Sequence, residues 1–295
     1  MMPHQLNWQE ICQMIPKRKA DAQKGDFGRL LCITGSRNMP GACLLSTQAA
    51  LRGGAGLVTV ATAPENPMRL AAAAPEAMWL PLETDEAGFL RSNDQNRKTL
   101  EKQLSRANAV LLGCGLGVTE ETRRLVHWVL EQAVCPVVLD ADGLNCAVSC
   151  IELSRRTGKD WILTPHPGEM ARLTGRSIPQ IQENRVETAT QFAAAYPVTL
   201  ALKGAGTLVA QGSRLAQNPT GNPGMSRGGS GDVLAGLIAA FAAQGIPSWE
   251  AACAGVYLHG LAGDAAAAAL SQQAMLPRDL LAYLPPVLVK LEQER

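Results

Sequence analysis

Short apolar runs alternate with helical stretches along the first two-thirds of the chain, and this alternation limits the possible folds most. Five runs lack polar–apolar alternation; they fall at 29–34, 57–62, 108–113, 136–140 and 161–164, with Ala- and Leu-rich segments between them. Strands of this kind are buried on both faces. Strands joined by right-handed helical crossovers form a parallel sheet. The sequence therefore predicts an α/β fold, with a mostly parallel central sheet and helices on both faces.

Two further strands break this order. The segments VTLALKG and GTLVAQ, within 198–211, are separated by too little chain for a crossover helix. They predict an antiparallel β-hairpin near one edge of the sheet. From residue 230 onward the sequence is almost entirely helical in pattern, and about the first 25 residues predict a helix and an extended lead-in. We expect a single domain over 1–295, because a chain of this length buries a sizeable core.

Composition and charge exclude several classes of protein. With 46% hydrophobic and 18% charged residues, the chain has the composition of an ordinary globular protein. A net charge of +1 gives no electrostatic footprint for nucleic acid or an anionic membrane. The apolar segment 251–270 contains His259 and Asp264 and is rich in Ala and Gly, so we interpret it as one or two closely packed buried helices rather than a membrane span. The N-terminus lacks the apolar core of a signal peptide.

The eight cysteines fall mostly inside apolar runs and include no Cys-x-x-Cys pair. This pattern favours buried thiols over disulfides or zinc ligands. Thiols of this kind fit a reducing compartment, so we expect a cytoplasmic protein.

Unusual loops follow the predicted strands. They are TGSRNMPGA, GCGLG (113–117), DADGLN, TPHPGEM and, in the hairpin, KGAG. Open parallel sheets bind ligands beyond the carboxyl ends of their strands. The joint placement of these loops therefore predicts a binding site at that edge.

The segment GMSRGGSGDVLAG (224–236) places glycines directly before Asp232 and a predicted helix. Glycine amides and the positive end of a helix dipole together form an anion hole suited to a phosphate. Asp232 either stabilises the helix start as an N-terminal acid or acts as a general base while a phosphoryl group arrives. The glycines favour the second role. The chain contains no Walker A motif, and Val118 stands where a dinucleotide fingerprint needs glycine, which disfavours a dehydrogenase.

Three other positions are candidates whose roles stay open at this point. Lys203, in KGAGT, either holds a nucleotide phosphate as a point charge or belongs to an ordinary exposed hairpin. His166, between two prolines, is either a ligand contact or a structural residue. Asp140 and Asp142 either hold Mg²⁺ through water or position a hydroxyl, or else cap the next helix.

With these motifs in place, the chain resembles the ADP-dependent NAD(P)H-hydrate dehydratases, a branch of the ribokinase-like superfamily. The resemblance covers nearly the whole length. It rests on KGDFGRLLCITGS (24–36), GGAGLVTVAT, LLGCGLG, DADGLN, LTPHPGEMARL and NPGMSRGGSGDVLAG.

The resemblance implies a repair reaction: the S epimer of hydrated NADH or NADPH is dehydrated by a carbon–oxygen lyase, with ADP, or ATP in some relatives, and Mg²⁺. Asp232 would activate the hydrate hydroxyl toward the terminal phosphate, releasing AMP and phosphate. By the same resemblance, the nucleotide contacts fall on Lys203, Gly204, Ala205, Gly206, Thr207 and Gly231. The hydrate contacts fall on Ala42, Gly117, His166 and Asp232.

The resemblance also implies a homo-oligomer, and the chain has no room for the epimerase domain that many relatives carry. A stand-alone dehydratase, or one trimmed from its full-length context, is therefore expected. Two other functions compete with this one: a vitamin or sugar kinase of the same fold, and a non-catalytic nucleotide sensor.

Overall fold

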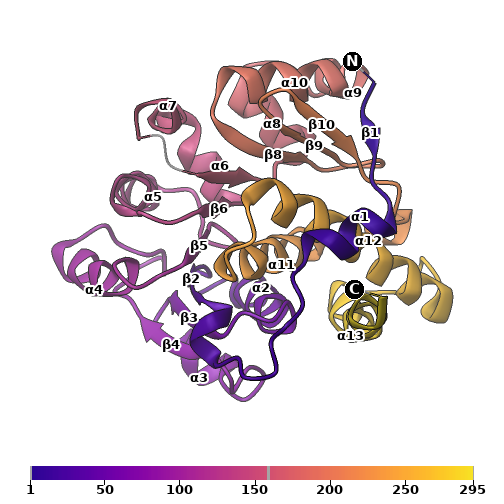
Figure 1. Ribbon diagram of the computed structural model, residues 1–295. Coiled ribbons are helices and arrows are strands. Elements are labelled where there is room, and N and C mark those ends of the chain that lie inside the picture. The colour runs from indigo at the N-terminus through magenta and orange to yellow at the C-terminus, as the bar shows by residue number, and fades with distance from the viewer. Residues whose placement is uncertain (1, 158–159, 295) are drawn as a thin grey trace.

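The structure is a computed structural model that describes residues 2–157 and 160–294. Within these ranges ten strands form one sheet, in the order β1-β10-β9-β8-β7-β6-β5-β2-β3-β4 (Figure 1). The parallel strands are β2 (Arg29–Ile33), β3 (Leu57–Thr62), β4 (Met78–Pro81), β5 (Ala109–Leu112), β6 (Val137–Leu139), β7 (Trp161–Leu163) and β8 (Val198–Leu202). The predicted parallel sheet is confirmed.

The predicted hairpin, β8 with β9, is also confirmed and lies near one edge of this sheet. Strand β9 (Leu208–Gln211) is antiparallel to both β8 and β10 (Arg214–Gln217). The two residues of β1 (His4–Gln5) then pair in parallel with β10. The sequence did not predict β1, β4 or β10: β1 has two residues, β10 has four with a polar residue at each end, and β4 is a partly exposed strand that ends in proline.

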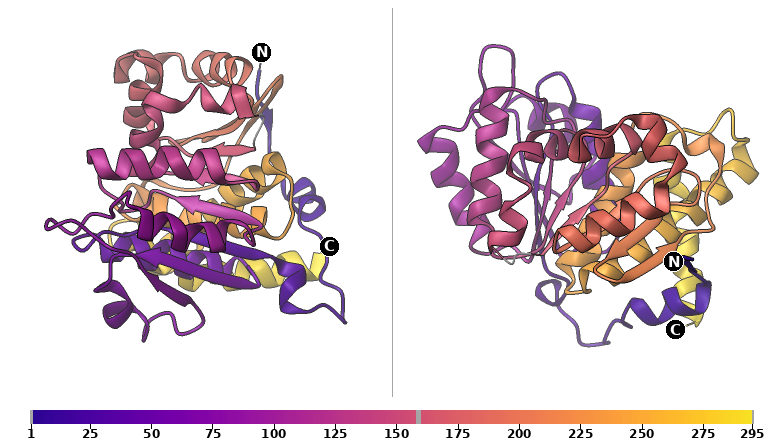
Figure 2. Two further views of the ribbon diagram at one scale, coloured as in Figure 1. Left: turned by 90° about the vertical axis from the view of Figure 1, so that its left-hand side faces the viewer. Right: turned by 90° about the horizontal axis from the view of Figure 1, so that it is seen from above.

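Helices cover both faces of the sheet (Figure 2). One layer contains α1 (Trp8–Met14), α2 (Pro40–Arg52), α3 (Asn66–Leu70), α11 (Ser230–Ala243), α12 (Ser248–Leu270) and α13 (Pro277–Glu294). The other contains α4 (Asp94–Leu104), α5 (Glu120–Gln132), α6 (Asp142–Ala147), α7 (Leu153–Thr157), α8 (Pro167–Thr174), α9 (Ile178–Glu183) and α10 (Arg185–Ala195). Short 3₁₀ turns lie at Lys24–Phe27, Val148–Cys150 and Pro223–Met225.

Alternate residues of each central strand enter opposite cores, which explains their continuous apolar sequence. In β2, Leu30 and Cys32 face the layer that contains α11, whereas Leu31 and Ile33 face the layer that contains α5. Because both faces of these strands are covered, most of their positions are apolar.

Helix α11 packs very closely against α2. A Cβ atom on Gly236 would lie 2.2 Å from the backbone oxygen of Ser46. The Ala- and Gly-rich composition of this helix therefore permits close packing and fixes where its N-terminus lies.

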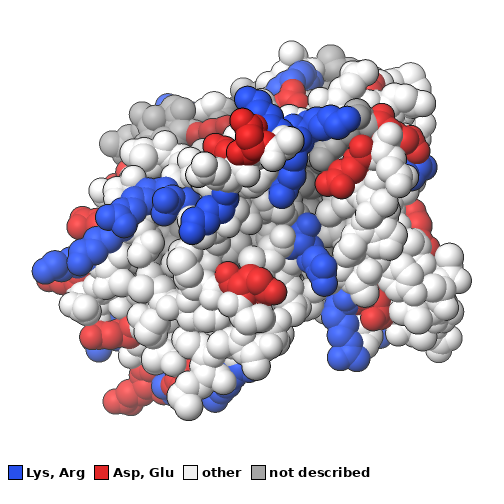
Figure 3. All heavy atoms as spheres, turned by 60° about the horizontal axis from the view of Figure 1, so that its bottom comes forward, with Lys and Arg blue, Asp and Glu red and all other residues white. Residues whose placement is uncertain are grey.

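Helix α12 is one continuous, largely buried helix, as the sequence predicted for 251–270. Among the described residues, no helix combines the length and apolar character needed to cross a membrane. Cys32, Cys43, Cys114, Cys146, Cys150 and Cys253 are buried thiols outside any disulfide, as predicted. On the face drawn in Figure 3, Lys and Arg side chains are mixed with Asp and Glu side chains among uncharged ones.

Candidate active site

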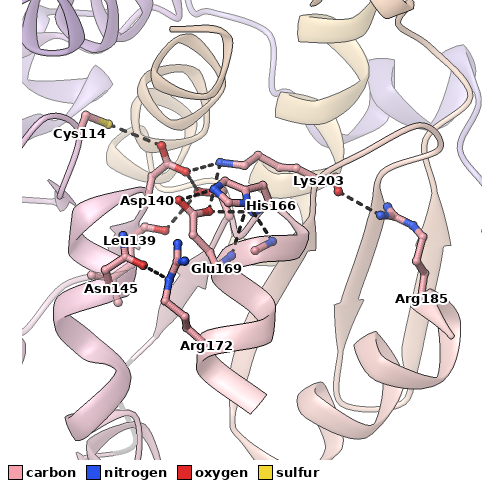
Figure 4. A network of polar contacts seen from close by, with 11 residues as sticks. Cys114, Leu139, Asp140, Asn145, His166, Glu169, Arg172, Arg185 and Lys203 are labelled. Carbon is pink, nitrogen blue, oxygen red and sulfur yellow. Dashed lines mark hydrogen bonds and ion pairs between the residues drawn. The ribbon is translucent and has the colours of Figure 1, made fainter. Parts of the chain in front are cut away.

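A buried ion pair lies at the carboxyl ends of the central strands (Figure 4). Asp140 follows β6 and Lys203 follows β8, and their Oδ1 and Nζ atoms are 2.6 Å apart. Thr164, after β7, donates a hydrogen bond of 2.7 Å to the same carboxylate oxygen. Burial lowers the pKa of Lys203 while the carboxylates of Asp140 and Glu169 raise it, and the net shift is upward. The ammonium group is therefore charged and compensated within the protein.

Asp232 lies beside this pair in the first turn of α11, as predicted. One ligating atom from each of Cys114, Asp140 and Asp232 lies within 4.8 Å of the others. Burial, followed by the negative charge of Asp140, raises the pKa of Asp232 to about 7. A carboxylate that titrates near neutral pH is well matched to accept a proton from a hydroxyl group.

The glycines before Asp232 form an open helix start. Gly229 is the N-cap residue with φ = +106°, and no side chain caps the helix. The amides of Gly231 and Asp232 donate no hydrogen bond to the described backbone. A Cβ atom on Gly231 would lie 3.2 Å from Lys203 Nζ. Donors, dipole and ammonium group therefore converge where a phosphate fits.

His259 supports this helix start from α12. Its Nε2 atom lies 3.0 Å from the backbone oxygen of Ser230. The imidazole is buried, and burial lowers its pKa to about 4, so it is neutral at pH 7 and donates to that carbonyl. The sequence offered no signal for this contact, because it joins segments 29 residues apart.

The loop GCGLG packs tightly between its neighbours, and all five of its residues are buried. The backbone oxygens of Cys114 and Gly115 accept hydrogen bonds of 2.8 and 2.7 Å from the amides of Gly35 and Ser36. A Cβ atom on Gly115 would lie 2.8 Å from the Cβ of Ala42, so the loop and the start of α2 form one surface.

Gly117 ends this loop, and its amide donates to Asp142 Oδ2 at 2.8 Å. A Cβ there would lie 2.3 Å from the ring of Phe89. Ala141, between the two aspartates, has φ = +50°, a strained conformation for a residue with a side chain. This conformation separates Asp140, which faces Lys203, from Asp142, which faces Gly117. Neither acid caps α6, whose N-cap is Ala141 with no side-chain hydrogen bond.

His166 is the N-cap of α8. Its Nδ1 atom accepts hydrogen bonds from the amides of Gly168 (2.9 Å) and Glu169 (3.3 Å), and its side chain is half exposed. The structural role is thus present, and the Nε2 atom of the ring lies 3.3 Å from Glu169 Oε1. Glu169 was not predicted as a site residue, yet its buried carboxylate lies 3.8 Å from Lys203 Nζ.

The lysine turn, residues 203–207, is more open. Gly204 and Ala205 are exposed, and Gly204 and Gly206 have φ values of +144° and +64°. The Arg185 guanidinium donates to the backbone oxygen of Lys203 at 3.1 Å, and Thr207 Oγ1 donates to Gly204 at 3.0 Å. The exposed backbone of this turn lies next to the charge cluster, because Lys203 belongs to both.

With this geometry described, the chain was compared with known proteins. A family model described as NAD(P)H-hydrate dehydratase matches residues 30–286. The chain belongs to this family. A curated ADP-dependent (S)-NAD(P)H-hydrate dehydratase from Neisseria meningitidis is 38% identical over 252 residues, covering 84% of this chain and 80% of the relative. One from Xanthomonas campestris is 36% identical, with 91% and 90% covered.

Longer members of the dehydratase family also match. A bifunctional NAD(P)H-hydrate repair enzyme from Moorella thermoacetica is 43% identical over 281 residues, which are 95% of this chain and 53% of the relative. The chain thus spans about half the length of such relatives. A crystal structure of an ADP/ATP-dependent NAD(P)H-hydrate dehydratase from Bacillus subtilis, co-crystallised with ATP and Mg²⁺, superposes with a TM-score of 0.81 at 31% identity, covering 98% of this chain and 99% of that one.

A ribokinase-like superfamily protein from Enterococcus faecalis superposes with a TM-score of 0.84 at 30% identity, covering 98% of this chain and 96% of that one. The ribokinase-like fold expected from the sequence is confirmed. For this member of the dehydratase family, the fold and the position of the charged cluster at the strand ends agree with the sequence analysis.

The cluster of Cys114, Asp140 and Asp232 is compact enough to surround a metal ion. However, Lys203 already supplies a positive charge 2.6 Å from Asp140. Burial and the neighbouring carboxylates raise the pKa of the Cys114 thiol well above its ordinary value, so it is not a thiolate ligand. Asp142 is engaged by the amide of Gly117. These residues therefore do not fit a resident metal ion.

Proposed function

We propose that this protein dehydrates the S epimer of hydrated NADH or NADPH, using ADP and releasing AMP and phosphate. The observation that carries the proposal is the position of Asp232: a carboxylate with a raised pKa, at an uncapped, glycine-lined helix N-terminus beside a partly buried lysine. The names of the Neisseria and Xanthomonas relatives support the substrate and the nucleotide.

In the first step, Asp232 takes the proton of the hydrate hydroxyl while that oxygen attacks the terminal phosphorus of ADP. A new bond forms between the hydrate oxygen and the terminal phosphorus. At the same time the bond between that phosphorus and the bridging oxygen of ADP breaks, and AMP leaves with that oxygen. The amides of Gly231 and Asp232 and the ammonium of Lys203 stabilise the charge that develops on the transferring group.

In the second step, the C–O bond of the phosphorylated hydrate breaks, because phosphate is a far better leaving group than hydroxide. The lone pair of the ring nitrogen drives this departure. Loss of a proton from the adjacent ring carbon then restores the ring double bond of NADH or NADPH.

The remaining contacts are proposals of the same kind. The hydrate lies against Ala42, Gly117 and His166. The nucleotide lies against the lysine turn (Lys203, Gly204, Ala205, Gly206 and Thr207) and Gly231. Mg²⁺ enters with the nucleotide as part of the co-substrate, in line with the ATP and Mg²⁺ of the Bacillus crystals. A cytoplasmic location and a homo-oligomeric assembly stay predictions from the sequence.

The test is to incubate the purified protein with hydrated NADH, ADP and Mg²⁺ and to follow the absorbance of reduced nicotinamide. We expect absorbance to return only when nucleotide is present, with one AMP released per NADH. Accumulation of a stable phosphorylated product would instead identify a kinase. Nucleotide binding without any product would identify a sensor.

A further inference from the structure

The fully buried thiol of Cys114 has no part in the steps above, yet it lies beside the carboxylates of the site. Its Sγ atom is 3.8 Å from Asp140 Oδ2, within reach of a thiol hydrogen bond (Figure 4), and it lies within 4.8 Å of a carboxylate oxygen of Asp232. Among the described residues, these three form the compact cluster of acidic and thiol groups noted above.

The loop holds this thiol in place. Gly113 and Gly115 on either side adopt φ values of +127° and +63°, and the amide of Gly35 binds the Cys114 carbonyl at 2.8 Å. The backbone on both sides of Cys114 is therefore fixed, and its thiol is held 3.8 Å from Asp140 Oδ2.

Asp140 and Asp232 repel each other because their carboxylates lie close together, so their joint ionisation needs donors. Lys203 compensates Asp140 directly. The groups that act on Asp232 come from several elements: Asp140, Lys203 and Cys114 on the strand-end loops, Asp142 at the start of α6, and Cys43 on α2. Of these, Lys203 and Cys114 favour the ionised form of Asp232, and the Cys114 thiol is a donor within 4.8 Å of its carboxylate.

We propose that Cys114 is a positioning residue, which donates its thiol hydrogen to the Asp140–Asp232 pair and keeps Asp232 ionised and oriented for proton abstraction. The thiol suits this place because it is a weak donor that stays protonated: it stabilises the carboxylate without surrendering a proton to it. The inference rests on the proposed function for its kinetic consequence, but its structural part stands on the cluster alone.

The sign of the effect follows from the role. Removing a donor that stabilises the carboxylate raises the pKa of Asp232, and abstraction requires the carboxylate. In Cys114→Ala the acid limb of the pH profile of kcat/KM therefore moves to higher pH, by about half to one pH unit, since a weak hydrogen bond is worth about that much. The rate recovers toward the wild-type value above this limb.

Two variants sharpen the test. Cys114→Ser keeps a donor on a shorter bond, so its acid limb lies between those of the wild type and Cys114→Ala. Cys253→Ala removes another fully buried thiol, on α12, whose charged neighbours Glu250, Arg214 and Glu10 lie outside the site. Its acid limb stays where the wild type has it. A shift in Cys253→Ala equal to that in Cys114→Ala, or no shift in either, overturns the proposal.

An infrared measurement is independent of turnover and of the stability of Cys114→Ala. The S–H stretching band of Cys114 is assigned in the wild type as the band lost in Cys114→Ser. We expect its frequency to change with pH, with the midpoint at which Asp232 titrates, and to lose this dependence in Asp232→Asn. A band that is insensitive to pH overturns the proposal even if the protein has no dehydratase activity. If the band titrates and turnover is absent, the proposed function fails and the inference stands.

Discussion

Two glycine-rich loops follow strands of the same sheet, one after β5 and one after β8, yet their glycines serve opposite purposes. In GCGLG (113–117) every residue is buried, and the glycines are there because backbone and side-chain atoms of other segments occupy the space of a Cβ atom. In the lysine turn (203–207) the glycines permit a turn conformation and leave backbone exposed. The first loop is a preformed wall around the reacting groups, whereas the second is a surface on which a nucleotide can lie.

Lys203 joins these two regions. Its backbone begins the open turn, and its ammonium enters the buried cluster against Asp140. We therefore expect changes in the buried region to affect chemistry and stability, and changes in the turn to affect nucleotide binding. The following variants test that division, in decreasing order of expected effect.

Asp232→Asn belongs to the buried region and removes the proposed base without changing its size. We expect kcat to fall by about 10²–10⁴-fold, the usual contribution of a general base. Calorimetric titration should give an unchanged nucleotide affinity. Wild-type turnover in this variant would remove Asp232 from the mechanism. An equal loss of nucleotide affinity would contradict the division, because a change in the buried region would then affect nucleotide binding.

Gly113→Ala and Gly206→Ala form a matched pair, since both glycines have positive φ. A Cβ on Gly113 would lie 2.2 Å from the backbone oxygen of Asp140, so we expect a loss of about 4 kcal/mol of unfolding free energy from overlap and strain. A Cβ on Gly206 would meet the flexible side chain of Gln217, and only the backbone strain of about 1 kcal/mol remains. Denaturant titrations with equal losses would contradict the contrast.

Lys203→Ala affects both regions because Asp140 is left as a buried charge without its partner. We expect a loss of about 3 kcal/mol in unfolding free energy near neutral pH. Nucleotide should bind more weakly as well, with a smaller effect on the hydrate. Unchanged stability in urea would mean that the ion pair is not formed in solution.

The raised pKa of Asp232 predicts how stability depends on pH. The folded state holds this proton up to pH of about 7, whereas the ordinary value for Asp is 3.8. Between these values the folded state binds more protons, so this group makes stability fall as pH rises, on the order of 4 kcal/mol over the whole range. Asp232→Asn should remove this part of the decline. A thermal-unfolding profile with the same slope in both proteins would show that Asp232 titrates normally.

The sequence predicted the sheet, the hairpin and the position of Asp232, because each depends on local signals. Long apolar runs reveal strands that are buried on both faces, as for β2 and β5. Strand β4 (Met78–Pro81) has an exposed edge and gives no such signal, and β1 has only two residues. The pairing of Lys203 with Asp140 was not visible, because it brings together segments 63 residues apart. Cys114 was predicted as a buried thiol, but only the approach of separate strand ends places it against two carboxylates.

The most direct test of the central claim is a crystal structure of the protein with ADP and Mg²⁺. The account predicts that the terminal phosphate lies against the amides of Gly231 and Asp232, with the adenosine over the lysine turn and the Asp232 carboxylate facing the side from which the hydrate hydroxyl attacks. A nucleotide whose phosphates lie away from the start of α11 would contradict it.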